Sequence, residues 1–287
     1  MSQPNPPSQR LRPFAQVDVF TAVPLKGNPL AVVVDGSGLD EAQMLAFARW
    51  TNLSETTFLL PPTLPGADYR VRIFTPGGEL PFAGHPTLGS AQVWLAHGGV
   101  PKTAGRVVQE SAIGTVVLRQ EGERLAFAAP PLKRSGPVPA ELRERVLRSL
   151  RIDAAELLDL VWVDNGGPAW MAARLKSAEA VLALQPDFLA MQGLDLGVVG
   201  AYPPGHELQF EVRGFVPDLS VPEDPVTGSL NAGLALWLID SGLAPTRYIA
   251  SQGTALQRAG RIHVSREDGQ TWIGGDVCFL IQGQVLL

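Results

Sequence analysis

The sequence predicts an α+β fold with two halves of similar design, each consisting of a sheet wrapped around one apolar helix. Two observations carry this prediction. Short segments of strand-like composition alternate with a few helical ones, and motifs of the first half recur in the second half in the same order. The length of 287 residues agrees with two domains, because a single core rarely grows past about 250–300 residues.

The internal repeat rests on three pairs of motifs. Each motif of the first half has a counterpart that begins 139 or 141 residues later. A single match is weak, whereas three matches in the same order favour a duplicated architecture. A duplication whose motifs only shape turns is the alternative interpretation. The pairs are GNP at 27–29 with GGP at 166–168, RIFTP at 72–76 with RGFVP at 213–217, and PTLGS at 86–90 with PVTGS at 225–229.

The first half is expected to contain seven strands and two helices. Asp40 caps a predicted helix that runs to about Trp50, with apolar residues at helical spacing. A second helix is predicted to start near Pro86, because proline suits the first helical position, and to end at Gly98. Strands are predicted at 14–20, 30–34, 55–60, 69–74, 106–109, 115–119 and 124–128.

The Pro-rich stretch 129–139 is the best candidate for a domain boundary. We therefore predict an N-terminal domain at 10–129 and a C-terminal domain at 130–287, and leave open a return of the last strand to the first domain. The second half is expected to hold a helix at 139–150, strands near 159–163 and 169–174, and a long buried helix at 226–240 opened by Pro225.

Composition excludes several classes of protein. The net charge is −5 and no basic run is present, so neither nucleic acid nor a membrane is an expected partner. The polar, Pro-rich start MSQPNPPSQR predicts a frayed tail and not a signal peptide, and we expect a cytoplasmic protein. The single cysteine, Cys278, excludes an intrachain disulfide and is expected to be buried. No metal site is expected, because no His, Asp or Glu pair has ligand spacing.

The starts of the two apolar helices are the candidate binding site. A helix N-terminus presents unpaired N–H groups and a partial positive charge, which suit a carboxylate. His85 and Asp224 directly precede the two prolines at the same offset, 139 residues, and are therefore expected to occupy corresponding positions. Small residues allow a ligand to approach the backbone, and those at the two predicted starts are Gly84, Gly89, Ser90, Gly228 and Ser229.

Glu55 is the candidate base. It follows a capped helix and begins an apolar strand, where charged residues are rare. An exposed strand-end carboxylate is the alternative on residue type alone. The neighbouring hydroxyls of Ser54 and Thr56 and the apolar residues beyond favour a partly buried position. Burial raises a carboxyl pKa from about 4.3 toward about 6–7, where the group can accept and return a proton.

At these residues the sequence resembles the phenazine-biosynthesis isomerase family (PhzF-like), which has the diaminopimelate-epimerase-like fold. The resemblance covers nearly the whole chain in order. ELPFAGHPTLGSA together with EDPVTGS is its most specific part. The other matching segments are VDVFTAVPLKGNPLAVV, which contains Asn28, NLSETTFLLPP and the looser SQGTALQRAGRIHV.

The resemblance implies two domains, each a sheet barrel around a central helix, with the site between them. It also implies a homodimer and no cofactor. The Glu, His, Asp and Ser of the family motifs match Glu55, His85, Asp224 and Ser229, and the family Glu shuttles a proton between carbons. The two-cysteine mechanism of the epimerase branch is excluded, because this chain has no cysteine at either helix start.

The sequence thus predicts an isomerase or epimerase without a cofactor. Glu55 moves a proton on a small carboxylic acid, His85 and Asp224 polarise the ligand, and Asn28 lies in the substrate-binding site. Two other classes remain open. One is a binding protein of the same fold that has lost turnover. The other is a hydrolase that uses Ser229 or Ser90, which the lack of a Gly-x-Ser-x-Gly motif disfavours.

Overall fold

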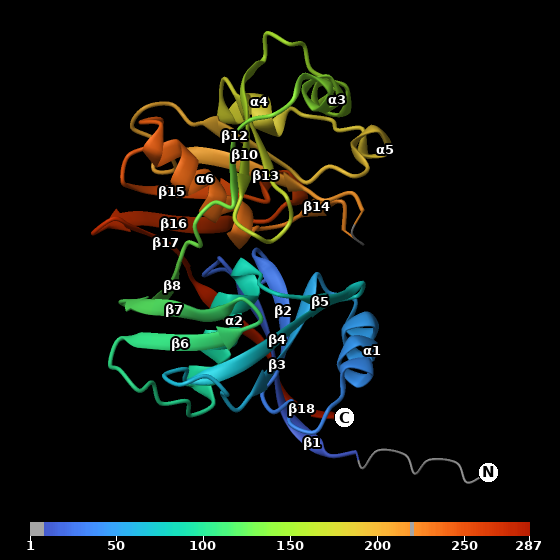
Figure 1. The fold of residues 1–287 in the computed structure, drawn as a ribbon, viewed down its shortest axis with the longest axis vertical. Helices are drawn as coiled ribbons and strands as arrows, with labels where there is room; N and C mark the ends of the chain where they lie inside the picture. The colour runs from blue at the N-terminus through green and yellow to red at the C-terminus, as the bar shows by residue number, and fades with distance from the viewer. Residues whose placement is uncertain (1–8, 219–220) are drawn as a thin grey trace, which may run out of the picture.

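The computed structural model describes residues 9–218 and 221–287. Most of the predicted N-terminal tail lies outside these residues. Figure 1 shows two lobes stacked along the long axis, with the strands that precede β9 in one lobe and β10 to β17 in the other. This arrangement confirms the predicted α+β fold of two similar halves. None of the described helices combines the length and the apolar character that a bilayer crossing requires.

The seven strands and two helices predicted for the first half are all present. Asp40 caps the first helix by accepting from the Gln43 N–H, and Gln43 bonds back to the Asp40 N–H. The elements are β1 (Leu11–Val19), β2 (Asn28–Val33), α1 (Glu41–Thr51), β3 (Glu55–Leu60), β4 (Tyr69–Thr75), β5 (Gly78–Leu80), α2 (Gly84–Ala96), β6 (Arg106–Ser111), β7 (Gly114–Glu121) and β8 (Arg124–Ala128).

The second half follows, and the predicted linker contains a short strand. The elements are β9 (Arg134–Pro137), α3 (Ala140–Leu150), β10 (Leu157–Asp164), β11 (Met171–Leu175), α4 (Ala178–Leu182), α5 (Phe188–Met191), β12 (Leu196–Ala201), β13 (Phe210–Phe215), β14 (Glu223–Asp224), α6 (Gly228–Asp240), β15 (Arg247–Gln252), the short helix η1 (Thr254–Leu256), β16 (Gly260–Glu267), β17 (Gln270–Gly275) and β18 (Val277–Leu286).

The strand pairing repeats between the halves. In the first half, β1–β2 is antiparallel, β2–β3 parallel, β3–β4 and β4–β5 antiparallel, and β4–β6 parallel. The same sequence of pairings holds for β10–β11, β11–β12, β12–β13, β13–β14 and β13–β15. Two antiparallel pairings then complete each half. The repeat is thus one topology used twice.

Three strands join the two halves. β8 pairs with β17. β9 leaves the first half and pairs with β10. β18 returns from the second half and pairs along β1, so the chain ends beside its first strand. Cys278 lies on β18 and is half-buried, not buried as expected. The domain boundary at 129/130 stays a prediction.

Helices α2 and α6 occupy the centres of the two lobes. Nine of the 13 residues of each helix are buried. A helix that is surrounded by a sheet needs apolar or small residues on every side, which explains why neither helix has a single apolar stripe. α2 contacts β1, β2, β3 and β8, and α6 contacts β10, β16 and β17. The core therefore sits around these two helices.

The predicted helix starts were wrong by two residues each. α2 begins at Gly84, so Pro86 is its third residue, whereas α6 begins at Gly228, three residues after Pro225. The connection from β5 to α2 has the same length as the connection from β14 to α6. Aligning the two helix starts therefore places ELPFAGHPT opposite EDPVTGSLN. His85 therefore corresponds to Ser229, and Asp224 corresponds to Leu80. The expected equivalence of His85 and Asp224 is wrong, because it equated two prolines that occupy different places relative to their helices.

A repeated ion pair supports this register. Arg72 Nη2 lies 2.5 Å from Glu79 Oε2 in the first half. Arg213 makes a bidentate pair with Glu223 in the second half, at 2.9 and 2.8 Å. The side chains of Arg72 and Glu79 are 24% and 30% exposed, whereas those of Arg213 and Glu223 are only 6% and 7% exposed.

The two ion pairs are expected to differ in their contribution to stability. Arg213→Met should lower the free energy of unfolding by about 3–5 kcal/mol, because it leaves the Glu223 carboxylate buried without a partner. The matched control Arg72→Met should lower it by about 1 kcal/mol or less, because water screens a half-exposed pair. Urea unfolding measures both changes. Equal losses for the two variants would contradict this assignment.

Candidate active site

The N-termini of α2 and α6 meet backbone to backbone. A Cβ placed on Gly84 would lie 2.6 Å from the Gly228 Cα, and one placed on Gly228 would lie 2.7 Å from the Gly84 Cα. Any larger residue at either position would force the helices apart. Both helices lack a side-chain cap, so no capping side chain accepts a hydrogen bond from the N–H groups of either first turn. Two positive helix ends therefore converge on one place between the halves.

Glu55 lies beside this meeting point. It is the first residue of β3, where it pairs with Leu30 of β2. Its Oε2 atom lies 3.3 Å from His85 Nε2, and the two side chains are only 14% and 4% exposed. Neither of these two buried atoms has an aligned hydrogen-bond partner among the described residues. The predicted partly buried position of Glu55 agrees with the structure, and the unpartnered atoms leave room for a ligand group to bond to them.

Burial shifts the titration of both groups toward their uncharged forms. It raises the pKa of Glu55 well above its ordinary value, and the Asp224 carboxylate raises this pKa further. Burial lowers the pKa of His85 to about 3, against a smaller opposite effect of a hydrogen bond with the Pro29 backbone. His85 is therefore a neutral imidazole at pH 7, and its contact with Glu55 is not an ion pair.

Asn28 connects the two halves at the site. Its Nδ2 donates to Asp224 Oδ1 at 2.8 Å and to the Val226 carbonyl at 2.9 Å, and it lies 3.3 Å from His85 Nδ1. Its buried Oδ1 has no partner among the described residues. Asn28 thus contacts both His85 and Asp224, and its Oδ1 atom remains available to accept a hydrogen bond.

Asp224 lies in β14, ahead of α6, and bonds to its own half as well. Its Oδ2 accepts from the Thr227 hydroxyl at 2.6 Å. Burial raises the pKa of Asp224 to about 6, and the Glu223 charge adds to this effect, while the hydrogen bonds from Thr227 and Asn28 oppose it. Asp224 therefore titrates much closer to neutrality than an ordinary aspartate.

Ser229 is the second residue of α6 and lies opposite the first turn of α2. The indole Nε1 of Trp170 donates to its Oγ at 3.1 Å, and the Asn165 side chain donates to its carbonyl at 2.8 Å. The sequence reasoning missed Trp170, Asn165 and Thr227. In the sequence, only their positions could have indicated that these residues belong to the site. Thr227 lies inside the PVTGS motif, and Asn165 and Trp170 flank the GGP motif.

Two predicted binding residues are not at a helix start. Gly89 lies inside α2, where a Cβ would come within 2.6 Å of the Leu30 side chain. Ser90 is buried, and its Oγ lies 2.9 Å from the Thr57 hydroxyl. The expected position of these two residues is wrong, because the PTLGS motif begins inside α2 and not before it. Both residues pack against the surrounding strands.

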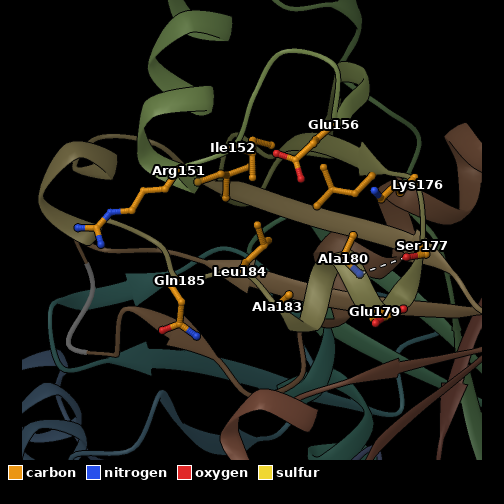
Figure 2. Close-up of a pocket in the computed structure, with 12 residues that line it drawn as sticks. Arg151, Ile152, Glu156, Lys176, Ser177, Glu179, Ala180, Ala183, Leu184 and Gln185 are labelled. Carbon is orange, nitrogen blue, oxygen red and sulfur yellow. Dashed lines mark hydrogen bonds between the residues drawn. The ribbon is translucent and has the colours of Figure 1, made fainter.

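An open cavity of about 500 Å³ lies apart from this site, on the second half. Figure 2 shows it between the end of α3 and α4, with Arg151 at one side and Lys176 at the other. None of the predicted site residues lines it. The cavity has the volume of a ligand pocket, but none of the buried polar atoms that lack a partner among the described residues belongs to its lining. In the described ranges, no three His, Cys, Asp or Glu side chains gather in a metal-binding arrangement.

Comparisons with known proteins identify the family of the chain. The family model described as "Phenazine biosynthesis-like protein" matches residues 17–283. The chain is 35% identical to trans-2,3-dihydro-3-hydroxyanthranilate isomerase from Pseudomonas fluorescens, over 80% of each chain. It is 34% identical to antisense-enhancing sequence 1 from Schizosaccharomyces pombe, over 94% of this chain and 97% of that protein.

Solved structures give the same result. A phenazine biosynthesis protein of the PhzF family from Enterococcus faecalis superposes with a TM-score of 0.79 at 27% identity, over 97% of this chain and all of that one. A hydroxyproline epimerase from Agrobacterium vitis superposes with a TM-score of 0.58 at 14% identity, over 97% of this chain and 93% of that one, which shows a shared fold alone.

The contact between the helix starts makes a direct prediction. Gly84→Ala should destabilise the protein by about 1–3 kcal/mol, because a methyl group would overlap the backbone of Gly228. The control Gly78→Ala, which meets no heavy atom within 4 Å, should change stability by about 0.5 kcal/mol or less. Thermal unfolding measures both variants. An unchanged melting temperature for Gly84→Ala would argue against the close approach of the helices.

Proposed function

The chain belongs to the phenazine biosynthesis-like protein family and is an isomerase, and we propose that it moves a proton between carbons of a small carboxylic acid. In this proposal Glu55 is the general acid and base, and no cofactor takes part. The observation that carries it is the buried pair of Glu55 Oε2 and His85 Nε2, 3.3 Å apart and both without aligned partners.

The environment of Glu55 suits proton transfer to and from carbon. A general base works best when its pKa lies near the operating pH, and burial together with the Asp224 charge moves the pKa of Glu55 in that direction. The carboxylate accepts a proton from an activated carbon and returns it, as the acid, to another carbon or to the same one. Each step leaves Glu55 ready for the next, so the cycle needs no other reagent.

The two helix starts support the binding of an acid. The uncapped N–H groups at Gly84, Gly228 and Ser229 can hold a substrate carboxylate without a lysine or arginine in direct contact. The same groups stabilise negative charge that develops when a proton leaves the neighbouring carbon. The neutral His85 imidazole can hydrogen-bond to the substrate through Nε2, and Asp224 with Asn28 can orient a polar substituent of the substrate.

The relatives suggest a first compound to test. Trans-2,3-dihydro-3-hydroxyanthranilate is named for a relative that is 35% identical. It is a small acid of the class that this site can hold, and we propose it as the first candidate substrate. A homodimer and a cytoplasmic location stay predictions from the resemblance and from composition.

A binding protein that has lost turnover is the competing proposal. It would keep the acid-binding helix starts and show a ligand-induced rise in melting temperature without any hydrogen exchange. The buried, unpartnered state of both Glu55 and His85 favours the enzyme, because a binding protein gains nothing from a raised carboxyl pKa.

Glu55→Gln should abolish solvent deuterium incorporation into the substrate while the fold and ligand binding persist. The amide keeps the size of the side chain but cannot carry a proton to and from carbon. Mass spectrometry of the acid after incubation in heavy water measures the rate, and a thermal shift with the same acid measures binding. Deuterium incorporation at the parent rate would exclude Glu55 as the base.

The pH profile should report the coupling of the two carboxyls. As a base in the free enzyme, Glu55 must be deprotonated, so kcat/KM should fall as pH falls through its raised pKa. Asp224→Asn should move this acid limb to lower pH, because the variant removes a negative charge that raises the pKa of Glu55. Residual exchange rates between about pH 4 and 9 test the shift, since the range covers ordinary and raised carboxyl pKa values. An acid limb that stays in place or moves upward would contradict the coupling.

A further inference from the structure

The two halves bring loops of the same construction to the site. Asp18, near the end of β1, accepts a hydrogen bond from the Gly27 N–H at 3.0 Å through its Oδ2 atom. Asp164, the last residue of β10, accepts one from the Gly166 N–H at 2.7 Å through its Oδ1 atom. The GNP and GGP loops therefore start in the same way, each with its glycine bonded to an aspartate of the preceding strand. These bonds extend the internal repeat to the two loops.

The residue that follows this glycine differs between the two loops. It is Asn28 in the first loop and Gly167 in the second. The Asn28 side chain crosses to the other half, where it bonds to Asp224 and to the Val226 carbonyl. Gly167 has no side chain that could cross in the opposite direction. The halves are therefore bridged at the first loop, and the matching position of the second loop is left without a bridge.

The protein does not fill the space beside Gly167. Apart from its chain neighbours, a Cβ placed on Gly167 would have a single heavy atom within 4 Å, the Cβ of Ser229 at 3.9 Å, which is ordinary van der Waals contact. The φ angle of Gly167 also lies outside the left-handed region that favours glycine. Neither the packing nor the backbone conformation thus requires a glycine here. A glycine also allows a ligand to approach the backbone closely, and this is the role that remains.

The neighbours of this space are held in place by hydrogen bonds. Ser229 borders the space at the start of α6, and the Trp170 indole donates to the Ser229 hydroxyl at 3.1 Å. Lys133 covers the preceding residue, because a Cβ placed on Gly166 would overlap the Lys133 side chain. The Lys133 N–H donates to the Asp164 carbonyl at 2.7 Å, which ties the segment before β9 to the loop. The walls of the space are therefore fixed by contacts within the second half.

The space adjoins the groups that the proposed function assigns to the substrate carboxylate. Those groups are the uncapped N–H groups at Gly84, Gly228 and Ser229. An acid that is bound there by its carboxylate has its remaining atoms next to Ser229. Because Glu55 approaches from the first half, the part of the acid that does not react has room on the side of Gly167.

We propose that the non-reacting part of the substrate lies over Gly167 and that this glycine limits the size of the acid that the site accepts. The inference rests on the proposed function, which places the carboxylate at the two helix starts. Gly167 is in this proposal a specificity-determining residue, because it contacts the substrate but moves no proton. Larger residues at position 167 should therefore exclude bulky acids, whereas small acids should still bind at the helix starts.

Two acids of equal charge and different bulk test this proposal by binding alone. Acetate and benzoate each carry a single carboxylate at neutral pH, and benzoate adds a ring. The parent protein should bind both, and acetate should displace benzoate competitively, because the two carboxylates occupy the same place. Gly167→Val should weaken benzoate binding by about 10-fold or more, the factor expected when a pocket misfits by a methylene, and should change acetate binding about twofold or less. Gly167→Ala should lie between the parent and Gly167→Val. Ligand-observed NMR titrations measure the dissociation constants.

Gly283→Val is the matched control. Gly283 lies on β18, where it pairs with Phe14, and it also has an open Cβ position and no left-handed φ. This variant adds the same side chain away from the site and should bind both acids as the parent does. Thermal unfolding shows whether both valine variants fold, and if Gly167→Val does not, Gly167→Ala carries the same test.

Benzoate binding at the parent strength in Gly167→Val would overturn the proposal. An equal loss of both acids would overturn it as well, because the effect would then lie at the helix starts. So would a parent protein that binds acetate but not benzoate, since the space would not admit a ring. A parent that binds neither acid would instead refute the acid-binding part of the proposed function, and this inference would fall with it.

Discussion

The contact between the first residues of α2 and α6 is the constraint on which the rest of the molecule depends. Gly84 and Gly228 touch backbone to backbone, which only residues without a Cβ allow. This contact brings the two lobes together at their helix starts and leaves the N–H groups of both first turns without side-chain caps. The sheets around the helices hold this arrangement in place. The candidate site for an anion is therefore built into the way the halves meet.

Burial at this point gives the site its chemistry. The same desolvation raises the pKa of Glu55 and Asp224 and lowers that of His85, so all three groups shift toward uncharged forms. Asn28 connects the imidazole to Asp224 across the two halves. Groups that share one buried environment titrate together, and the proton on Glu55 depends on the charge of Asp224. The protonation state of the site is therefore a property of the cluster and not of one residue.

The repeated topology carries unequal side chains at equivalent places. His85 at the start of α2 corresponds to Ser229 at the start of α6. The strand pairing makes Asp195 the counterpart of Glu55, and this aspartate accepts a hydrogen bond from the Ala169 N–H beside the GGP loop. Duplication thus produced two helix starts, whereas the groups that we assign to proton transfer gather on one side.

Local patterns in the sequence were enough to identify the fold class, both central helices and Glu55, His85 and Asp224 as candidate site residues, because strand and helix periods and Pro and Gly positions act over a few residues. They did not determine how the two helix starts correspond, and they placed Gly89 and Ser90 at a helix start although both lie inside α2. The sequence also did not predict the hydrogen bond between Asn28 and Asp224 or the one between Arg258 and the Gly27 carbonyl. These bonds join residues about 200 positions apart, and only the packing of one half against the other brings such residues within hydrogen-bond distance.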